Sequence, residues 1–246
     1  PLLDVRDLCV DFVNGSAVTH AVRGVSFQLG HEKLAIVGAT GSGKTTVVNL
    51  LTRFYDIDGG SITLDGESIY DIPKKKLRGS IGIVLQDTVI FNDTIMQNIR
   101  YGRLDATDEE VIAAAKTAKV ADFAEKMADG YDTMLTEGGG NLSQGQRQLI
   151  AIARAVLADP KILILDEATS SIDTRTEVHI QEAMLALMKG RTSLIIAHRL
   201  STIRDADKIV VIDGGKVVEA GNHEKLLSEN GAYARLYNTQ FAGIKT

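Results

Sequence analysis

Short apolar runs broken by polar turns dominate the first third of the chain and predict β-strands. One compact apolar run, residues 33–37, ends at Gly38. Residues 45–51 instead place their apolar side chains on one side of a helix, and residues 58–60 (Asp-Gly-Gly) then interrupt the chain. We expect strands at residues 2–12, 21–29, 33–37 and 61–64. The pattern is thus strand, loop, helix, strand.

The middle of the chain changes to helical spacing. After an apolar run at residues 81–85, which predicts a strand, residues 95–99 and the alanine-rich residues 111–128 have the apolar spacing of helices. A further helix starts near Ser143, carries its apolar side chains on one side and stops at residues 159–160, where proline disfavours helical backbone before it. A mostly helical insert is expected here.

Strand patterns return in the last third of the chain. Apolar runs at residues 162–165 and 193–197 flank a helical stretch at residues 176–188. This alternation predicts a parallel sheet that is covered by helices on both faces. A hairpin and a polar helix complete the pattern. We expect the hairpin strands at residues 209–212 and 217–220, their turn at residues 213–215, and one helix over residues 223–240.

Length and composition place the chain among globular proteins. Its 246 residues allow one large domain or two small ones, and 44% apolar with 24% charged residues is near the globular average. The net charge of −5 argues against a surface devoted to nucleic acid. The single cysteine, Cys9, excludes an intrachain disulfide and predicts a buried thiol in a reducing compartment.

The chain lacks the patterns of membrane insertion and secretion. No apolar run reaches the roughly 20 residues that a membrane span needs, and no charged-then-apolar leader opens the sequence. We therefore expect this chain to be soluble by itself. It begins at Pro1 rather than at a methionine, which is compatible with a piece of a longer polypeptide.

A glycine-rich segment between the strand at 33–37 and the following helix matches the phosphate-loop pattern G-x-x-x-x-G-K-[ST]. Its glycines let backbone N–H groups turn toward phosphate oxygens, Lys44 places a positive charge on the outer phosphates, and Thr45 offers a hydroxyl to magnesium. A plain glycine turn with a surface lysine is the weaker alternative, because strand and helix flank the motif as required. The predicted nucleotide-binding residues are Gly38, Ala39, Thr40, Gly41, Ser42, Gly43, Lys44, Thr45 and Thr46.

Two carboxylates follow the buried strand at residues 162–165, at the strand end where open parallel sheets bind their ligands. Asp166 is predicted to hold the magnesium ion through water, and Glu167 to orient and deprotonate an attacking water. Solvated acids at a strand end are the alternative. A phosphotransferase would not need Glu167 in this role, so the pair favours hydrolysis.

The helix that starts near Ser143 carries a third candidate site. Ser143 and Gln146 have the spacing of a capping box. Because Gly145 has no side chain in the first turn, this helix start also presents backbone N–H groups and the Ser143 hydroxyl to an anion. The residues alone leave the identity of that anion open.

Residues 142–148, Leu-Ser-Gln-Gly-Gln-Arg-Gln, lie between the phosphate loop and the acidic strand end and resemble the signature motif of ABC transporter ATPases. Gln86 resembles the family's Q-loop residue, residues 171–173 its D-loop, His198 its switch histidine and Phe12 its adenine-stacking aromatic. Residues 86–91 and 136–137 are similar to the exporter branch of the family. Gln144 stands where many relatives carry glycine, and Phe12 where tyrosine is common.

The resemblance implies an α/β fold: a P-loop NTPase (RecA-like) core with a mostly parallel sheet, an N-terminal antiparallel β-subdomain and an inserted α-helical subdomain. It implies one nucleotide-binding domain over residues 1–246. Residues 1–86 and 158–246 would form the ATPase core with the β-subdomain, and residues 87–157 the helical subdomain.

The resemblance also implies an ATP-hydrolysing motor at the cytoplasmic face of a membrane, driving an exporter. ATP would lie in a head-to-tail dimer of two such domains, where Ser143, Gly145 and Gln146 of one copy meet the nucleotide of the other. Glu167, His198 and Gln86 would be catalytic, Thr45, Gln86 and Asp166 would hold Mg²⁺, and Asp173 would bridge the two sites. The regions around Gln86 and Glu137 would contact separate transmembrane domains.

Three other functions remain open. A soluble ABC ATPase that works on chromosomes or ribosomes would need long heptads or a basic face, and neither pattern is present. A non-catalytic nucleotide sensor would not need Glu167. A kinase outside the family would leave the signature segment without a role. Cargo, organism and the identity of the partner half are not encoded in these residues.

Overall fold

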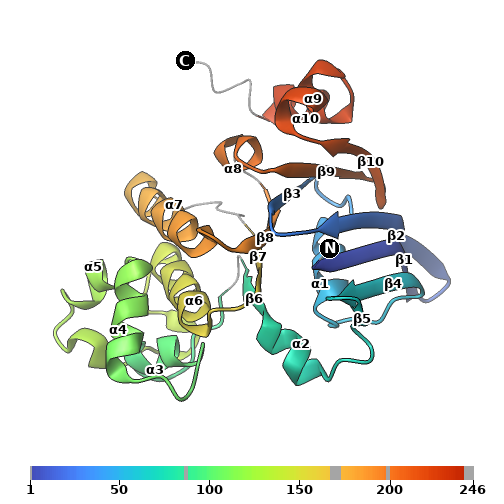
Figure 1. Ribbon diagram of the computed structural model, residues 1–246. Helices are drawn as coiled ribbons and strands as arrows, with labels where there is room; N and C mark the ends of the chain where they lie inside the picture. The colour runs from blue at the N-terminus through green and yellow to red at the C-terminus, as the bar shows by residue number, and fades with distance from the viewer. Residues whose placement is uncertain (1, 86–87, 167–172, 198–199, 241–246) are drawn as a thin grey trace. The chain divides into compact units, whose positions relative to one another are not determined.

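The computed structural model describes residues 2–85, 88–166, 173–197 and 200–240 (Figure 1). The chain forms two compact units, which we call the first unit (residues 1–81 and 192–246) and the second unit (residues 82–191). The helical subdomain expected at residues 87–157 falls within the second unit, and its boundaries stay a prediction.

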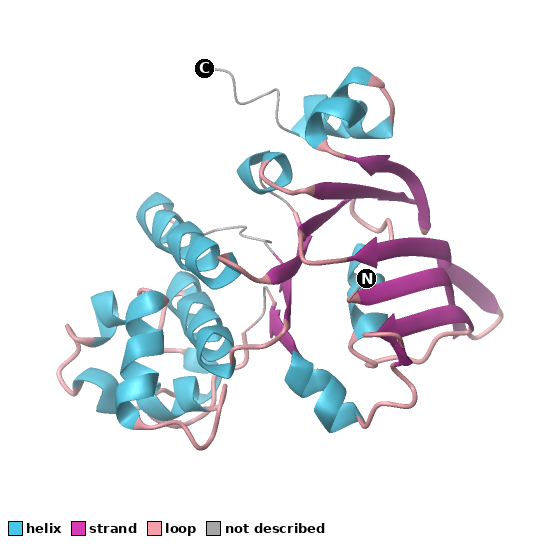
Figure 2. Ribbon diagram, viewed as in Figure 1, coloured by secondary structure: helices cyan, strands magenta, loops and turns pink. Residues whose placement is uncertain are grey.

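The first unit opens with a four-stranded antiparallel sheet (Figure 2). Its strands, in the order β2-β1-β4-β5, are β1 (Leu3–Asn14), β2 (Ala17–Leu29), β4 (Gly59–Leu64) and β5 (Glu67–Ser68). Every neighbouring pair is antiparallel, which confirms the expected β-subdomain. Leu8 and Val10 of β1 are buried, with Cys9 between them on the other face. Cys9 is only half-buried, contrary to the prediction, and its Sγ accepts a hydrogen bond from Gly24 N at 3.1 Å.

A second sheet of the first unit carries the phosphate loop. Its strands, in the order β10-β9-β3-β8, are β3 (Lys33–Val37), β8 (Thr192–Ile196), β9 (Lys208–Asp213) and β10 (Lys216–Gly221). β3 runs parallel to both β8 and β9, and β10 returns antiparallel to β9. The predicted parallel core and hairpin are therefore confirmed. Residues 34–37 of β3 are almost completely buried, as expected of a central parallel strand.

The described residues of the first unit also form five helices. They are α1 (Lys44–Leu51), α2 (Lys74–Ser80), α8 (Leu200–Arg204) and the pair α9 (His223–Ser228) and α10 (Ala232–Gln240), the last two counted as one in the sequence prediction. The single helix expected over residues 223–240 is wrong. Asn230 adopts a left-handed backbone with φ +50°, and the Glu219 carboxylate accepts hydrogen bonds from Ala232 N and Tyr233 N, so a new helix begins there.

The second unit contains two short strands and five α-helices among its described residues. They are β6 (Ile81–Val84), β7 (Ile162–Asp166), α3 (Ile95–Arg100), α4 (Asp108–Thr117), α5 (Ala121–Ala124), α6 (Gln144–Ala158) and α7 (Thr174–Met188). α6 packs against α3, α4 and α7, and apolar residues on it such as Ile150 and Ile152 are fully buried. The helix expected over residues 111–128 is wrong as one element, because Lys119 has φ +60° and separates α4 from α5.

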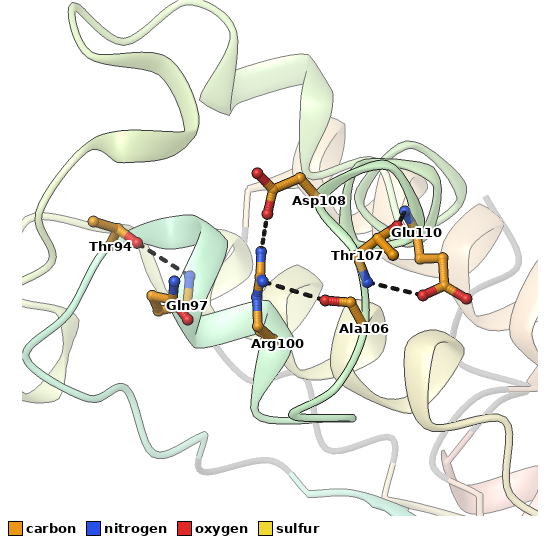
Figure 3. A network of polar contacts seen from close by, with 7 residues as sticks. All are labelled: Thr94, Gln97, Arg100, Ala106, Thr107, Asp108 and Glu110. Atoms are coloured by element: carbon orange, nitrogen blue, oxygen red, sulfur yellow. Dashed lines mark hydrogen bonds and ion pairs between the residues drawn. The ribbon is translucent and has the colours of Figure 1, made fainter.

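Side chains tie α3 to α4 in the second unit (Figure 3). Thr94 caps α3 by accepting from Gln97 N at 3.1 Å. Thr107 and Glu110 form a capping box at the start of α4. Arg100 at the end of α3 donates to Ala106 O at 3.2 Å and pairs with Asp108. Local polar contacts therefore set both helix starts in this region.

Candidate nucleotide-binding site

The phosphate loop joins β3 to α1 and has the backbone of an anion-binding loop. Gly41 has φ +79° and Gly43 has φ +102°, in the left-handed region that favours glycine. Gly43 is also the N-cap residue of α1 and has no side chain with which to cap it. The first amides of α1 are therefore presented at a helix start where the backbone partial charge favours an anion.

Contacts from three distant segments hold the loop. A Cβ atom added to Gly38 would lie 2.2 Å from Ile212 O at the end of β9, and one added to Gly43 would lie 2.7 Å from Ala21 O in β2. In addition, Gly215 N in the β9–β10 turn donates to Ser42 O at 3.1 Å. The loop is thus packed backbone to backbone, and the glycines are required for this close approach.

Lys44 is folded into the loop. Its side chain is buried, and its Nζ atom donates to Gly38 O at 2.6 Å, to Ala39 O at 2.8 Å and to Ser42 Oγ at 3.3 Å. These contacts place a positive charge inside the ring of backbone that a phosphate group would enter. The charge of this loop therefore suits an anion such as a phosphate group. Thr45, which follows on α1, is exposed, and Thr46 is half-buried.

Phe12 lies near the end of β1, opposite Thr19 of β2. Its side chain is 37% exposed and meets Tyr55 edge to face, with ring centroids 5.4 Å apart and an interplanar angle of 78°. A side chain with this exposure is not part of the hydrophobic core. Its predicted contact with an adenine ring stays a prediction.

The start of α6 has the capping box that its sequence predicts. Gln146 N donates to Ser143 Oγ at 3.2 Å, and Ser143 N donates to Gln146 Oε1 at 2.9 Å. Gly145 is buried in this first turn. Arg147, which the sequence analysis did not single out, donates from Nη1 to Leu142 O at 2.8 Å and to Gly139 O at 3.3 Å. Its position directly after the capping box was the one feature of the sequence that could have indicated this role.

Some of the remaining predicted site residues lie in the described parts of the chain, and others do not. Asp166 is half-buried at the carboxyl end of β7, where the sequence places it. Asp173 caps α7, and Thr176 N donates to its Oδ1 at 3.0 Å. These hydrogen bonds from Thr176 lower the pKa of Asp173. Glu137 is exposed in a 3₁₀ turn. Gln86, Glu167, Ser171, Ile172 and His198 lie outside the described residues.

The donor set is suited to a hard cation. Thr45 and Asp166 offer hydroxyl and carboxylate oxygens, the ligand type that Mg²⁺ prefers. Across the described parts of the chain, no group of three or more His, Cys, Asp or Glu side chains forms a cage for a metal. Thr45 belongs to the first unit and Asp166 to the second.

Comparisons with known proteins agree with these features. Residues 22–170 match the family model described as ABC transporter. The chain is 58% identical over 210 residues to the "Uncharacterized ABC transporter ATP-binding protein YfiC" of Bacillus subtilis, a match covering 85% of this chain and 35% of that protein. It is 55% identical over 212 residues to the "ATP-dependent lipid A-core flippase" of Hahella chejuensis, covering 86% of this chain and 36% of that protein.

A solved structure is also similar. It is titled "Structure of a bacterial Atm1-family ABC exporter with ATP bound" and superposes with a TM-score of 0.89 at 43% identity, covering 99% of this chain and 42% of that one. The chain thus spans little more than a third of the length of the two curated relatives. In the part of the chain that the structure describes, no helix has the length and apolar character to cross a membrane.

Proposed function

This chain belongs to the ABC transporter family and has its P-loop NTPase fold, and we propose that it is the ATP-hydrolysing domain of an ABC exporter. The observation that carries the proposal is the geometry of the phosphate loop. Lys44 Nζ lies within 3.3 Å of three oxygen atoms of the loop, and Gly43 is the N-cap of α1 and has no side chain to cap it. The proposal is supported by two similar proteins, one titled an ATP-dependent flippase and the other an ABC exporter.

In this proposal the loop binds the phosphates of ATP. Backbone amides from Gly41 to Thr45 donate to phosphate oxygens, and Lys44 neutralises charge on the outer phosphates. Thr45, Gln86 and Asp166 would hold Mg²⁺, which would neutralise further phosphate charge. Phe12 would stack on the adenine ring, a role that suits an exposed aromatic side chain.

Hydrolysis then depends on residues that follow three strands in the sequence, β6, β7 and β8. Glu167, next to Asp166 at the end of β7, orients the attacking water and accepts its proton. His198 follows β8 and holds the γ-phosphate, and Gln86 contacts the attacking water. These roles rest on the motif positions. Positioned general bases contribute about 10²- to 10⁴-fold in rate.

A second copy of the domain would complete the site. The start of α6 would face the γ-phosphate of the partner, and Asp173 would bridge the two sites. The capping box is compatible with this role: Ser143 Oγ accepts from Gln146 N through a lone pair, so its own proton can be donated to a phosphate oxygen. A hydroxyl group is both a donor and an acceptor, and the two contacts do not compete.

Transmembrane domains would bind the second unit near Gln86. Val89, Phe91 and Tyr101 of this unit are exposed. Exposed apolar side chains that contact each other usually mark a binding surface. Phe91 stacks on Tyr101 with ring centroids 4.1 Å apart. Arg154 lies over the Phe91 ring and donates to Val89 O at 2.6 Å, and burial lowers its pKa to about 10.

A buried amide makes that surface rigid. Asn98 is fully buried, accepts from Phe91 N at 2.9 Å and donates back to Phe91 O at 3.0 Å. Arg154 Nη2 donates to Asn98 Oδ1 at 2.8 Å. Because the Asn98 side chain is hydrogen-bonded to both Phe91 and Arg154, it holds the segment around Phe91 in one conformation, as a surface that transmits force to transmembrane helices would need.

We also propose that the domain lies at the cytoplasmic face of the membrane.

The test is ATP hydrolysis by Glu167→Gln. We expect this variant to bind ATP with the dissociation constant of the wild type and to release phosphate about 10²- to 10⁴-fold more slowly, because only the base is lost. Glu109→Gln, at an exposed position of α4, is the matched control and should hydrolyse ATP normally. Wild-type turnover in Glu167→Gln would refute the assigned base.

Lys44→Ala tests the cradle separately. Removing the ammonium group should weaken ATP binding itself by about tenfold or more, which a titration with a fluorescent ATP analogue measures. An unchanged dissociation constant would show that the loop does not bind the triphosphate.

A further inference from the structure

The turn between β9 and β10 is joined to the phosphate loop through Gly215. Its N–H donates to Ser42 O at 3.1 Å, and its C=O accepts from Arg23 N of β2 at 2.8 Å. Gly215 is buried, so these bonds are shielded from water. Both backbone groups of one residue thus connect the loop to the antiparallel sheet.

The space around Gly215 admits no side chain. A Cβ atom added there would lie 2.7 Å from Ala21 O, the same oxygen that a Cβ atom on Gly43 would approach to 2.7 Å. Two glycines from distant segments therefore pack against one carbonyl group. Since this neighbour is strand backbone, a side chain at position 215 must displace the turn, and the hydrogen bond to Ser42 O moves with it.

That hydrogen bond orients a phosphate-binding amide. The C=O of Ser42 and the N–H of Gly43 belong to one planar trans peptide group, so they point in opposite directions. When Gly215 holds the Ser42 oxygen, the Gly43 N–H points away from the turn. This amide is at the start of α1, where the cradle presents its donors.

We propose that Gly215 is a positioning residue for the phosphate loop, which orients the Gly43 amide for the phosphates of the nucleotide without contacting them. The inference rests on the proposed function, since it concerns the affinity of that same site for ATP. Donors that are already oriented bind more tightly, because binding does not have to order them.

The test compares Gly215→Ala with Gly24→Ala. Both residues have φ +77°, so both alanines must adopt the same unfavourable φ, but a Cβ atom on Gly24 has no heavy atom within 4 Å. We expect the dissociation constant for ATP to rise about tenfold or more in Gly215→Ala and to stay within about twofold of the wild type in Gly24→Ala. The melting temperature without nucleotide reports the effect on folding in both.

Equal ATP affinities of the two variants, at any melting temperature, would overturn the inference. If Gly215→Ala does not fold, amide hydrogen exchange of Gly215 in the wild type decides: we expect ATP to slow it about tenfold or more, and an unchanged rate overturns the inference. A wild-type chain that does not bind ATP refutes the proposed function itself. A wild-type chain that binds, with Gly215→Ala binding equally well, refutes only the positioning role.

Discussion

The phosphate loop and the start of α6 both present backbone amides at the start of a helix, but they are held by different means. The loop depends on backbone contacts with Ala21, Ile212 and Gly215, which lie more than 15 residues away in the sequence. The start of α6 depends on side chains of its own segment, in the capping box and in the bonds of Arg147 to the preceding turn.

This difference predicts how each region responds to mutation. A locally supported helix start should lose only the energy of the hydrogen bonds that are removed. A loop supported from a distance should lose packing between segments as well, so its substitutions should cost more and should alter ATP affinity.

Gly43→Ala should have the largest effect. It combines a left-handed backbone, φ +102°, with a Cβ atom 2.7 Å from Ala21 O. We expect the free energy of unfolding, measured by urea denaturation, to fall by about 3 kcal/mol. Gly66→Ala is the control, because its φ of +83° is similar but a Cβ atom meets open space. It should cost about 1 kcal/mol. Equal losses would mean that the contact with β2 does not hold the loop.

Arg147→Met removes the guanidinium group from the start of α6 and leaves the carbonyl groups of Leu142 and Gly139 without its hydrogen bonds. Hydrogen bonds that involve a charged group contribute about 2 kcal/mol, and we expect urea denaturation to show a loss of that size. Arg175→Met, at an exposed position, should stay within about 0.5 kcal/mol of the wild type. A loss in both variants alike would point to a general effect of charge.

Ser143→Ala removes the N-cap of α6, and Thr107→Ala removes the same kind of N-cap from α4. Each should lower the free energy of unfolding by about 1 kcal/mol. Only Ser143→Ala should also slow ATP hydrolysis, because only Ser143 is proposed to contact a nucleotide. If Ser143→Ala hydrolyses ATP at the wild-type rate but shows the expected loss of stability, then Ser143 acts only as a helix cap.

Asp173 should give the smallest effect, visible only in acid. Hydrogen bonds from Thr176 lower its pKa in the folded chain below the unfolded value of about 3.9. Its carboxylate therefore stabilises the fold above that pH, and the contribution is lost as the pH falls through the folded pKa. Asp173→Asn keeps a helix cap that carries no charge. Below about pH 4 the melting temperature of this variant should therefore fall less than that of the wild type. Parallel curves for the variant and the wild type would contradict this prediction.

Local patterns predicted most of the strands and both candidate helix starts. The strand at residues 33–37 and the capping box of Ser143 and Gln146 were predicted and confirmed, since each depends on neighbours within a few residues. The helix breaks at Lys119 and Asn230 were not predicted, because non-glycine residues adopt positive φ only where surrounding contacts favour it. α2 was also missed, because its apolar pattern is reduced to the buried Leu77.

Residue types and their spacing were enough to identify the family, which comparison confirms, and to predict the residues for its chemistry: the glycines and lysine of the loop, Asp166, Glu167 and the signature segment. These are patterns over a few adjacent positions. How the loop is held is visible only in the folded chain, where Ala21, Ile212 and Gly215 contact it although they are distant from it in the sequence. Backbone contacts between distant segments leave no mark on residue type except glycine, and glycine has too many other uses to identify them.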